Sequence, residues 1–253
     1  MRRNMEVHPK HESDYIVGRN AVNEAIKSGR SIDSIMVSSF DGFGSIKAIL
    51  AQAKDKGIVI KQVNKKVLNS ISDAHQGIIA IAAAKESCTI DDILNLAHQK
   101  NEQPFVIVAD GIEDPHNLGA IIRTAECVGA HGIIIPKRRA VGMTGAVDKS
   151  SAGALQHMLV AKVGNISLAL NYLKDQGLWI YGTDAQGTTF TKENLQGSVA
   201  LVIGSEGKGI SAGVKEKCDF MLSIPMKGRI NSLNASVAAG VLMYEVYRQR
   251  NSV

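Results

Sequence analysis

The sequence predicts an α/β protein: a mostly parallel sheet covered by helices on both sides, preceded by a small N-terminal α/β domain. From Pro104 onward, short apolar runs rich in Val and Ile recur without polar alternation. Such runs are typical of strands buried on both faces. Helical patterns lie between several of these runs. Before residue 85, shorter helices and strands alternate, and Gly29 and Gly57 follow two of the helices.

The composition is that of a globular protein, with room for one large or two ordinary domains. The chain has 253 residues, is 45% hydrophobic and carries a formal net charge of +5, from 29 Lys and Arg against 24 Asp and Glu. This modest basic excess fits nucleic acid as a partner, and it fits many other proteins as well. No apolar run approaches 18 residues and the beginning is polar, so we expect a cytoplasmic protein without membrane association.

The residue types that bind metals are scattered along the chain. Cys88, Cys127 and Cys218 form no Cys-x-x-Cys pair, and no histidine pairs with a cysteine or another histidine at ligand spacing. We therefore expect reduced thiols, no disulfide framework and no metal site.

The N-terminal part divides into three predicted segments. Residues 1–13 are polar and form a flexible tail. Residues 14–84 form a compact α/β domain, and residues 85–103 form a linker with one helix. Within the domain we expect helices at 20–28, 45–56 and 65–72 and strands at 31–37, 58–63 and 77–82.

Residues 104–253 form the second, larger domain. We expect strands at 105–109, 132–136, 158–163, 178–181, 199–203 and 220–224, and helices at 118–128, 147–155, 166–176 and 236–248. A parallel α/β sheet binds ligands outside the carboxyl ends of its strands. Three polar, glycine-containing loops follow such strand ends, and they are the candidate site.

The first loop, residues 110–117, leads into a helix. Asn117 is a candidate N-cap, and Arg123 and Glu126 are three residues apart on one helix face. One interpretation is therefore a capped helix with a surface ion pair. Against it, Arg123 lies within an otherwise apolar run, where a charge needs a partner.

The second loop, Gly204–Gly209, excludes two nucleotide-binding motifs by its spacing. Walker A needs four residues between its first glycine and the Gly-Lys pair, whereas two lie between Gly204 and Gly207. The spacing Gly-x-Gly-x-x-Gly of dinucleotide sites is absent as well. A plain glycine-rich turn is one interpretation. Glu206, a carboxylate between glycines at a strand end, favours a site instead.

The third loop lies between the last strand and the last helix, over residues 224–237. Ser232 and Asn234 can present a hydroxyl and an amide there, and Gly228 allows close backbone approach to a ligand. The alternative is that Ser232 or Asn234 caps the last helix. The two roles can coexist.

Together, the three loops resemble the three motifs of the SpoU family of RNA ribose 2′-O-methyltransferases, in the SPOUT class. The resemblance covers residues 104–250, and order and spacing agree. The stretches that carry it are Asp110–Glu126, Ile203–Gly209 and Ile224–Gly240, with Lys149–Leu155 similar to a fourth shared segment.

The N-terminal domain extends the resemblance. Val17–Val22 and His75–Ile78 resemble the family's small L30e-like domain, which binds the RNA substrate. The whole chain is most similar to the subgroup that methylates a guanosine ribose in the peptidyl-transferase region of 23S rRNA. Arg19, Arg30 and the triplet Lys137–Arg139 are candidate RNA contacts; for the triplet, a solvated loop is the alternative.

The resemblance implies a trefoil-knotted catalytic domain, a homodimer with the active site near the subunit interface, and S-adenosyl-L-methionine as the methyl donor. It implies cofactor binding by backbone around Gly204, Ile224 and Leu233, with Met226 lining the pocket. The polar positions that match the family's functional residues are Asn117, Arg123, Glu206, Ser232 and Asn234.

The reaction requires in-line attack of a ribose hydroxyl on a sulfonium methyl group, with loss of a proton. A guanidinium with a pKa above about 12 is a poor base. Our hypothesis therefore makes Arg123 a clamp on the target phosphate, oriented by Glu206, while the phosphate or water takes the proton.

The chain departs from the family pattern at Gln156, Met158 and Ala235, none of them a presumed catalytic group. Two alternative functions stay open: a tRNA ribose methyltransferase, and a non-catalytic RNA-binding or ribosome-assembly module.

Overall fold

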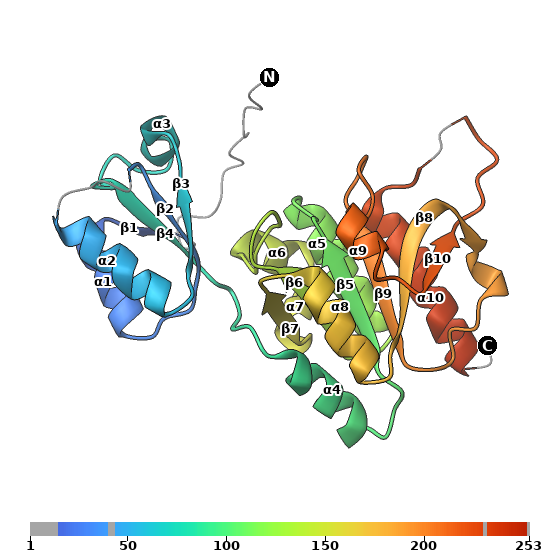
Figure 1. Cartoon of the computed structure of the whole chain (residues 1–253). Coiled ribbons are helices and arrows are strands. Elements are labelled where there is room, and N and C mark those ends of the chain that lie inside the picture. The colour runs from blue at the N-terminus through green and yellow to red at the C-terminus, as the bar shows by residue number, and fades with distance from the viewer. Residues whose placement is uncertain (1–14, 40–43, 230–231, 252–253) are drawn as a thin grey trace. The chain divides into compact units, whose positions relative to one another are not determined.

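The computed structural model describes residues 15–39, 44–229 and 232–251, so the flexible tail predicted for residues 1–13 lies outside the described residues. The chain divides into two compact units, which we describe separately (Figure 1). Unit 1 comprises Met1–Glu86 with Gly142–Ala146. Unit 2 comprises Ser87–Val141 with Val147–Val253.

Unit 1 contains a four-stranded sheet in the order β1-β4-β2-β3, in which β2 and β3 are parallel and the other pairs are antiparallel. Its strands are β1 (Tyr15–Val17), β2 (Ile32–Val37), β3 (Val59–Gln62) and β4 (Ile78–Ala82). Three of them were predicted. The sequence pattern missed β1, because three residues before Gly18 are too few to show alternation.

The helices of unit 1 cover both faces of this sheet. α1 (Arg19–Lys27) and α2 (Gly44–Asp55) pack on one face through residues such as Val22 and Ile49. On the other face, α3 (Lys65–Asn69) contributes the fully buried Leu68. All three helices occupy predicted segments.

Unit 2 is built on a six-stranded sheet in the order β10-β8-β9-β5-β6-β7, and every neighbouring pair is parallel. The strands are β5 (Phe105–Asp110), β6 (Gly132–Pro136), β7 (Val160–Val163), β8 (Trp179–Thr189), β9 (Val199–Gly204) and β10 (Phe220–Ser223). Each corresponds to a predicted strand. The predicted fold class, a mostly parallel α/β sheet behind a small α/β domain, is confirmed.

β8 is much longer than predicted because its pairing with β10 jumps. Met221 pairs with Gly182, and the next residue, Leu222, pairs with Thr188. A Cβ atom on Gly187 would lie 2.3 Å from the carbonyl oxygen of Met221, so glycine is required there. Such an irregularity leaves no trace in hydrophobic periodicity.

Helices cover both faces of the unit 2 sheet. They are α4 (Ile90–Gln99), α5 (Pro115–Cys127), α6 (Gly145–Ser150), α7 (Ala154–His157), α8 (Ile166–Asp175), α9 (Ala212–Lys215) and α10 (Ala235–Asn251), with a 3₁₀ turn, η2 (Phe190–Lys192), before β9. A single helix predicted for residues 147–155 was wrong. Ala152 and Gly153 both have positive φ, 52° and 86°, and this left-handed backbone separates α6 from α7.

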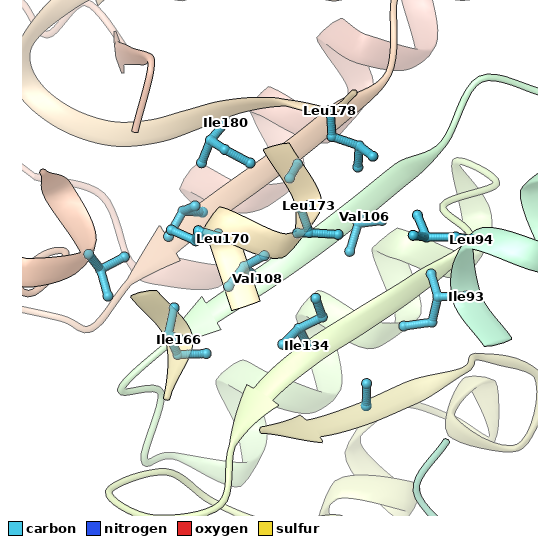
Figure 2. Packing of buried hydrophobic residues seen from close by; sticks show 14 of the residues in the cluster. Ile93, Leu94, Val106, Val108, Ile134, Ile166, Leu170, Leu173, Leu178 and Ile180 are labelled. Atoms are coloured by element: carbon cyan, nitrogen blue, oxygen red, sulfur yellow. The ribbon is translucent and has the colours of Figure 1, made fainter. Parts of the chain in front are cut away.

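One face of the sheet is closed by α4 and α8 (Figure 2). Val106 and Val108 of β5 pack there against Leu170 and Leu173 of α8. The residues between them on β5 point to the opposite face, where α5 and α10 pack against each other. Burial on both faces explains the apolar strands.

The segment predicted as a linker, residues 85–103, contains α4. This helix begins with a capping box, in which Thr89 and Asp92 bond each other's backbone. Its residues Ile93 and Leu94 belong to the core of unit 2 (Figure 2). No helix within the described residues is long and apolar enough to cross a membrane.

The amino ends of the central strands are held by two buried or half-buried basic side chains. Arg250, near the end of α10, donates to the carbonyl oxygens of Gln103 (2.9 Å), Pro104 (3.0 Å) and Gly197 (2.6 Å). Burial lowers its pKa to about 10. We call the region around these carbonyls the amino edge of the sheet.

The second of these side chains is His131, which is completely buried. Its Nδ1 accepts a hydrogen bond from the backbone N–H of Phe105 (3.0 Å), so the proton sits on Nε2, 3.0 Å from a carboxylate oxygen of Glu102. Burial lowers the pKa of His131, although the hydrogen bond to Glu102 opposes this shift.

Candidate active site

The arrangement of strands places a crevice at the carboxyl ends of β5 and β9. β6 and β7 lie on one side of β5, whereas β9, β8 and β10 lie on the other. Connections leave these strands in opposite directions, which is where open α/β sheets bind ligands. The last residues of the two strands, Asp110 and Gly204, are paired. The first and second candidate loops therefore begin side by side.

The first loop ends at a capped helix, but Asn117 is not the cap. Asp114 has extended backbone angles, its side chain accepts from the N–H of His116 (2.9 Å), and Pro115 is the first helical residue. The predicted cap at Asn117 is therefore wrong, because Asp114 and Pro115 start the helix three residues earlier. Asn117 is buried in the first turn, and its side chain is left to bond elsewhere.

The second loop is a tight turn that presents Glu206. The backbone N–H of Ser205 donates to the carbonyl oxygen of Gly209 (3.1 Å), and the reverse bond measures 2.9 Å. Gly207 and Gly209 have positive φ, and a Cβ atom on Gly204 would lie 2.2 Å from the carbonyl carbon of Gly209. The glycines therefore form a turn, which was one of the two interpretations of the sequence. The same turn places the carboxylate of Glu206 in the crevice.

Side chains from all three loops meet at Glu206. Asn117 Nδ2 donates to Glu206 Oε1 (3.2 Å), and Asn234 Nδ2 donates to Asn117 Oδ1 (2.9 Å) and also to Glu206 Oε1. Two amides that donate to one carboxylate oxygen stabilise its negative charge. We call these three residues the Asn117–Glu206–Asn234 cluster.

Asn234 also caps the last helix. Its Oδ1 accepts from the backbone N–H groups of Ser236 (3.0 Å) and Val237 (3.3 Å), at the start of α10. The side-chain oxygen thus serves the helix while the side-chain nitrogen serves the cluster. The two roles do coexist. Ser232 is exposed, and within the described residues no hydrogen bond engages its side chain.

Arg123 lies on the exposed face of α5. The expectation that it needs a partner within an apolar run was wrong, because its side chain reaches solvent. Within the described part of the chain no ion pair joins Arg123 to Glu126, and Glu206 bonds Asn117 and Asn234 instead of Arg123. The guanidinium is therefore available to a ligand.

The predicted cofactor residues differ in burial. Gly204 is buried and Ile224 is half-buried, whereas Met226 and Leu233 are 41% and 37% exposed. Large apolar side chains exposed on one loop suit a surface that a ligand covers. Their contacts with a cofactor stay predictions.

Two positioning contacts were not anticipated. Ser150 Oγ donates to the carbonyl oxygen of Pro115 (2.8 Å), and a Cβ atom on Gly119 would lie 2.0 Å from that hydroxyl oxygen. The segment Lys149–Leu155 thus fixes the first turn of α5 and, with it, Asn117. In addition, Asp110 accepts from the backbone N–H of Ser211 (2.8 Å), which ties β5 to the exit of the second loop.

Among the described residues there is no group of three or more His, Cys, Asp or Glu side chains placed to hold a metal ion. The chemistry available at this edge is that of amides, a carboxylate, hydroxyls and a guanidinium.

Comparison with known proteins first defines the class. Residues 104–244 match the model of the SpoU rRNA Methylase family, and residues 15–88 match that of RNA 2′-O ribose methyltransferase substrate binding. A Bacillus subtilis protein named as the TrmH family tRNA/rRNA methyltransferase YacO is 49% identical over 96% of this chain and 98% of its own length.

Two solved structures are similar as well. An S-adenosylmethionine-bound rRNA methyltransferase from Sinorhizobium meliloti covers 94% of this chain and 88% of its own, with a TM-score of 0.58 and 23% identity. The TrmH/SpoU tRNA modifying enzyme of A. aeolicus covers 60% of this chain and 77% of its own, with a TM-score of 0.55 and 29% identity.

The chain belongs to the SpoU family. It is an S-adenosylmethionine-dependent RNA ribose methyltransferase of this family, as the three motifs indicated.

Proposed function

We propose that this protein methylates the 2′-hydroxyl of a guanosine ribose in the peptidyl-transferase region of 23S rRNA. The observation that carries the proposal is the convergence of Asn117, Glu206 and Asn234, one from each candidate loop, at the switch point of the sheet.

The cluster acts by holding a carboxylate in one place. Both amides bond Oε1 of Glu206, and no hydrogen bond within the described residues engages Oε2. Oε2 is therefore the acceptor left for a hydroxyl of the substrate or for a water molecule. A hydroxyl held there is aligned for attack, and such alignment is the main task in this type of transfer. S-adenosylmethionine supplies the methyl group.

Arg123 clamps the phosphate of the target nucleotide. It lies six residues after Asn117 on α5, exposed and without a protein partner in the described residues. We propose that the phosphate or water takes the proton. The sequence led us to expect that Glu206 orients Arg123. Because Glu206 bonds the two amides instead, we propose that the RNA phosphate itself orients Arg123.

The cofactor lies between the second and third loops in this proposal. Backbone around Gly204, Ile224 and Leu233 holds its adenosine, and Met226 lines the pocket. A side chain at Gly204 would collide with Gly209, so the turn beside the proposed adenosine site requires glycine. The exposed apolar side chains of Met226 and Leu233 give the adenine a surface to pack on.

The choice of rRNA over tRNA rests on domain organisation. In this proposal residues 14–84 bind the RNA and residues 104–253 catalyse, while the connecting segment 85–103 packs its helix α4 into the core of unit 2. The rRNA methyltransferase from S. meliloti aligns across nearly all of this chain, while the tRNA modifying enzyme aligns only with a part. A tRNA target is the second candidate, because the name of YacO gives both tRNA and rRNA.

The substrate is identified by mapping ribose methylation in a strain that lacks this gene. We expect one 2′-O-methylguanosine to disappear from the peptidyl-transferase region of 23S rRNA and to return when the gene is restored. An unchanged rRNA map with a modification lost from tRNA would overturn the rRNA assignment. Unchanged maps in both RNAs would favour the non-catalytic alternative.

Arg123 gives a separate test of the clamp. Arg123→Gln should weaken RNA binding by about tenfold while S-adenosylmethionine binding stays the same, because one charge-assisted phosphate contact is lost. Arg123→Lys should recover part of this loss. If Arg123→Lys instead lowers turnover greatly with both affinities unchanged, the clamp is the wrong role.

We also propose that a second copy of the chain covers α10. Val237, Val241 and Tyr244 are 51%, 36% and 53% exposed and follow helical spacing, so they form an apolar stripe beside the site loop. The family resemblance implies a homodimer, and this stripe is the surface that fits one. Val241→Glu with Tyr244→Glu should convert a dimer to a monomer in sedimentation.

A cytoplasmic location remains part of the proposal.

A further inference from the structure

The loop after β6 carries three consecutive cations at the same edge of the sheet as the Asn117–Glu206–Asn234 cluster. Lys137, Arg138 and Arg139 follow Pro136, the last residue of β6, and all three are exposed. β6 is the parallel neighbour of β5, so the two strands end at the same edge. We call these residues the basic triplet.

The basic triplet is held in place at both ends. The backbone N–H of Lys137 donates to the carbonyl oxygen of Val163, at the end of β7 (2.8 Å). Beyond the triplet, the N–H of Val141 donates to the carbonyl oxygen of Ile112 (2.9 Å). Ile112 is buried in the first loop, between β5 and α5. The first bond attaches the triplet to the end of β7, and the second attaches it to the loop that leads into α5 and Asn117.

The backbone turns within the triplet. Arg139 has a φ of 57°, in the left-handed region, which an arginine adopts only at a cost. The turn brings the chain back toward Ile112 instead of letting it run outward. The side chains therefore project from a short, anchored turn.

The positive charges of the triplet are not used within the protein. In the part of the chain that the structure describes, no ion pair or hydrogen bond engages the side chains of Lys137, Arg138 or Arg139. Other cations of unit 2 do find carboxylates, such as Lys174 with Asp219 (2.6 Å) and Lys215 with Asp184 (2.6 Å).

The carboxylates near this edge are mostly engaged elsewhere. Glu206 accepts from two amides, Asp110 accepts from Ser211, and Asp114 caps α5. Glu113 is exposed and uncompensated. Hydrogen bonds from neutral N–H groups leave each of these carboxylates charged, so what this edge offers RNA is a local cluster of three unpaired cations and not a net positive charge.

We propose that the basic triplet binds the phosphodiester backbone of the RNA next to the target nucleotide. The inference rests on the proposed function, because the ribose must lie at the cluster and its flanking phosphates must cross the same edge. Lys and Arg bind such phosphates without reading the bases, so the triplet sets affinity and register and not sequence choice.

The test compares two triple variants with the same change in charge. Lys137→Gln, Arg138→Gln and Arg139→Gln together remove the triplet. The matched control carries Lys100→Gln, Lys192→Gln and Lys217→Gln, which lie in segments that lead into strands β5, β9 and β10. For each full-length protein, the dissociation constant for rRNA from a strain lacking this gene is measured at several salt concentrations.

We expect the triplet variant to bind this RNA at least about tenfold more weakly than the control variant. The slope of log affinity against log salt should become less steep by about two to three, because each lost phosphate contact removes roughly 0.7–0.9 from the size of the slope. S-adenosylmethionine affinity should stay the same. Equal losses in the two variants, or an unchanged slope, would overturn the proposal.

Two further measurements keep the outcomes separate. Lys137→Arg, Arg138→Lys and Arg139→Lys together keep the charges and should keep the slope; loss of binding in this variant would mean that the triplet is structural. If the wild-type protein transfers no methyl group to any RNA, the proposed function fails, whereas the binding comparison still decides the role of the triplet.

Discussion

The two edges of the unit 2 sheet use polar groups in opposite ways. At the amino edge, Arg250 gives its hydrogen bonds to three carbonyl oxygens and His131 bridges Phe105 and Glu102. At the carboxyl edge, Arg123 and the basic triplet have no protein partner in the described residues, and Glu206 keeps one oxygen open. Apart from Arg250 Nε, which has no hydrogen-bond partner in the described residues, the polar groups of the amino edge named here bond the protein itself, whereas those of the carboxyl edge are open to a ligand.

This difference separates stability from function. Groups bonded to the protein's own backbone contribute to folding, because removing them leaves carbonyls without donors. Groups left open contribute little to folding but can bind charge that arrives with RNA. Variants at the two edges should therefore fail in different assays.

Glu206→Gln should lower methyl transfer by about 100-fold or more, because a positioned charge at the reacting centre is lost while the shape is kept. The melting temperature should move by no more than about 2 °C, since the amide oxygen still accepts from Asn117 and Asn234. Glu113→Gln, an exposed carboxylate at the same edge, is the control and should keep full activity. Similar activity in both variants would remove Glu206 from the site.

Arg250→Met should cost about 2 kcal/mol of unfolding free energy, because the carbonyl oxygens of Gln103 and Gly197 lose the Arg250 donor, while that of Pro104 keeps only the N–H of Val199. The melting temperature should fall by roughly 4–8 °C for a unit of this size. Activity per folded molecule should not change. Lys100→Met, at an exposed position without such bonds, is the control. A loss of turnover without a loss of stability would contradict the division between the edges.

Because of His131, we expect the free energy of unfolding to depend on pH. Burial lowers its pKa from the ordinary 6.5, so the folded protein keeps it neutral at pH values where the unfolded chain binds a proton. Its contribution is complete above about pH 6.5 and is lost as the pH falls toward the folded pKa. His131→Asn keeps an acceptor for Phe105 and should flatten the unfolding free energy below pH 6.5. His98→Gln, at an exposed position, is the matched control.

The smallest effects compare two helix caps. Thr89→Ala removes the cap of α4, and Asn234→Ala removes the cap of α10; each should cost about 1 kcal/mol of stability. Only Asn234→Ala should also abolish methyl transfer. Asn234→Asp retains the cap but places a second carboxylate beside Glu206, so it should recover stability without activity. Recovery of activity in Asn234→Asp would make the cap the sole role of this residue.

Local sequence patterns predicted most strands and helices because burial on both faces leaves apolar runs that are easy to recognise. The patterns failed where geometry departs from periodicity. Ala152 and Gly153 break a predicted helix, and Gly187 accommodates a five-residue jump in the pairing of β8. Neither feature changes the hydrophobic pattern.

The candidate site was predicted differently. Asn117 and Glu206 are 89 residues apart, and Asn117 and Asn234 are 117 apart, so no local pattern could join them. Their grouping came from the resemblance to the SpoU motifs. The roles of single residues needed the structure: Asp114 took the cap assigned to Asn117, and Arg123 proved exposed.

The central claim is that the Asn117–Glu206–Asn234 cluster is the site of methyl transfer. The most direct measurement is incorporation of tritiated methyl from S-adenosylmethionine into rRNA from a strain lacking this gene, with wild-type, Asn234→Ala and Arg250→Met proteins. We expect label in a 2′-O-methylated nucleotide with the wild-type and Arg250→Met proteins, and at most background with Asn234→Ala. Full incorporation by a folded Asn234→Ala protein, or none by the wild type, would contradict the claim.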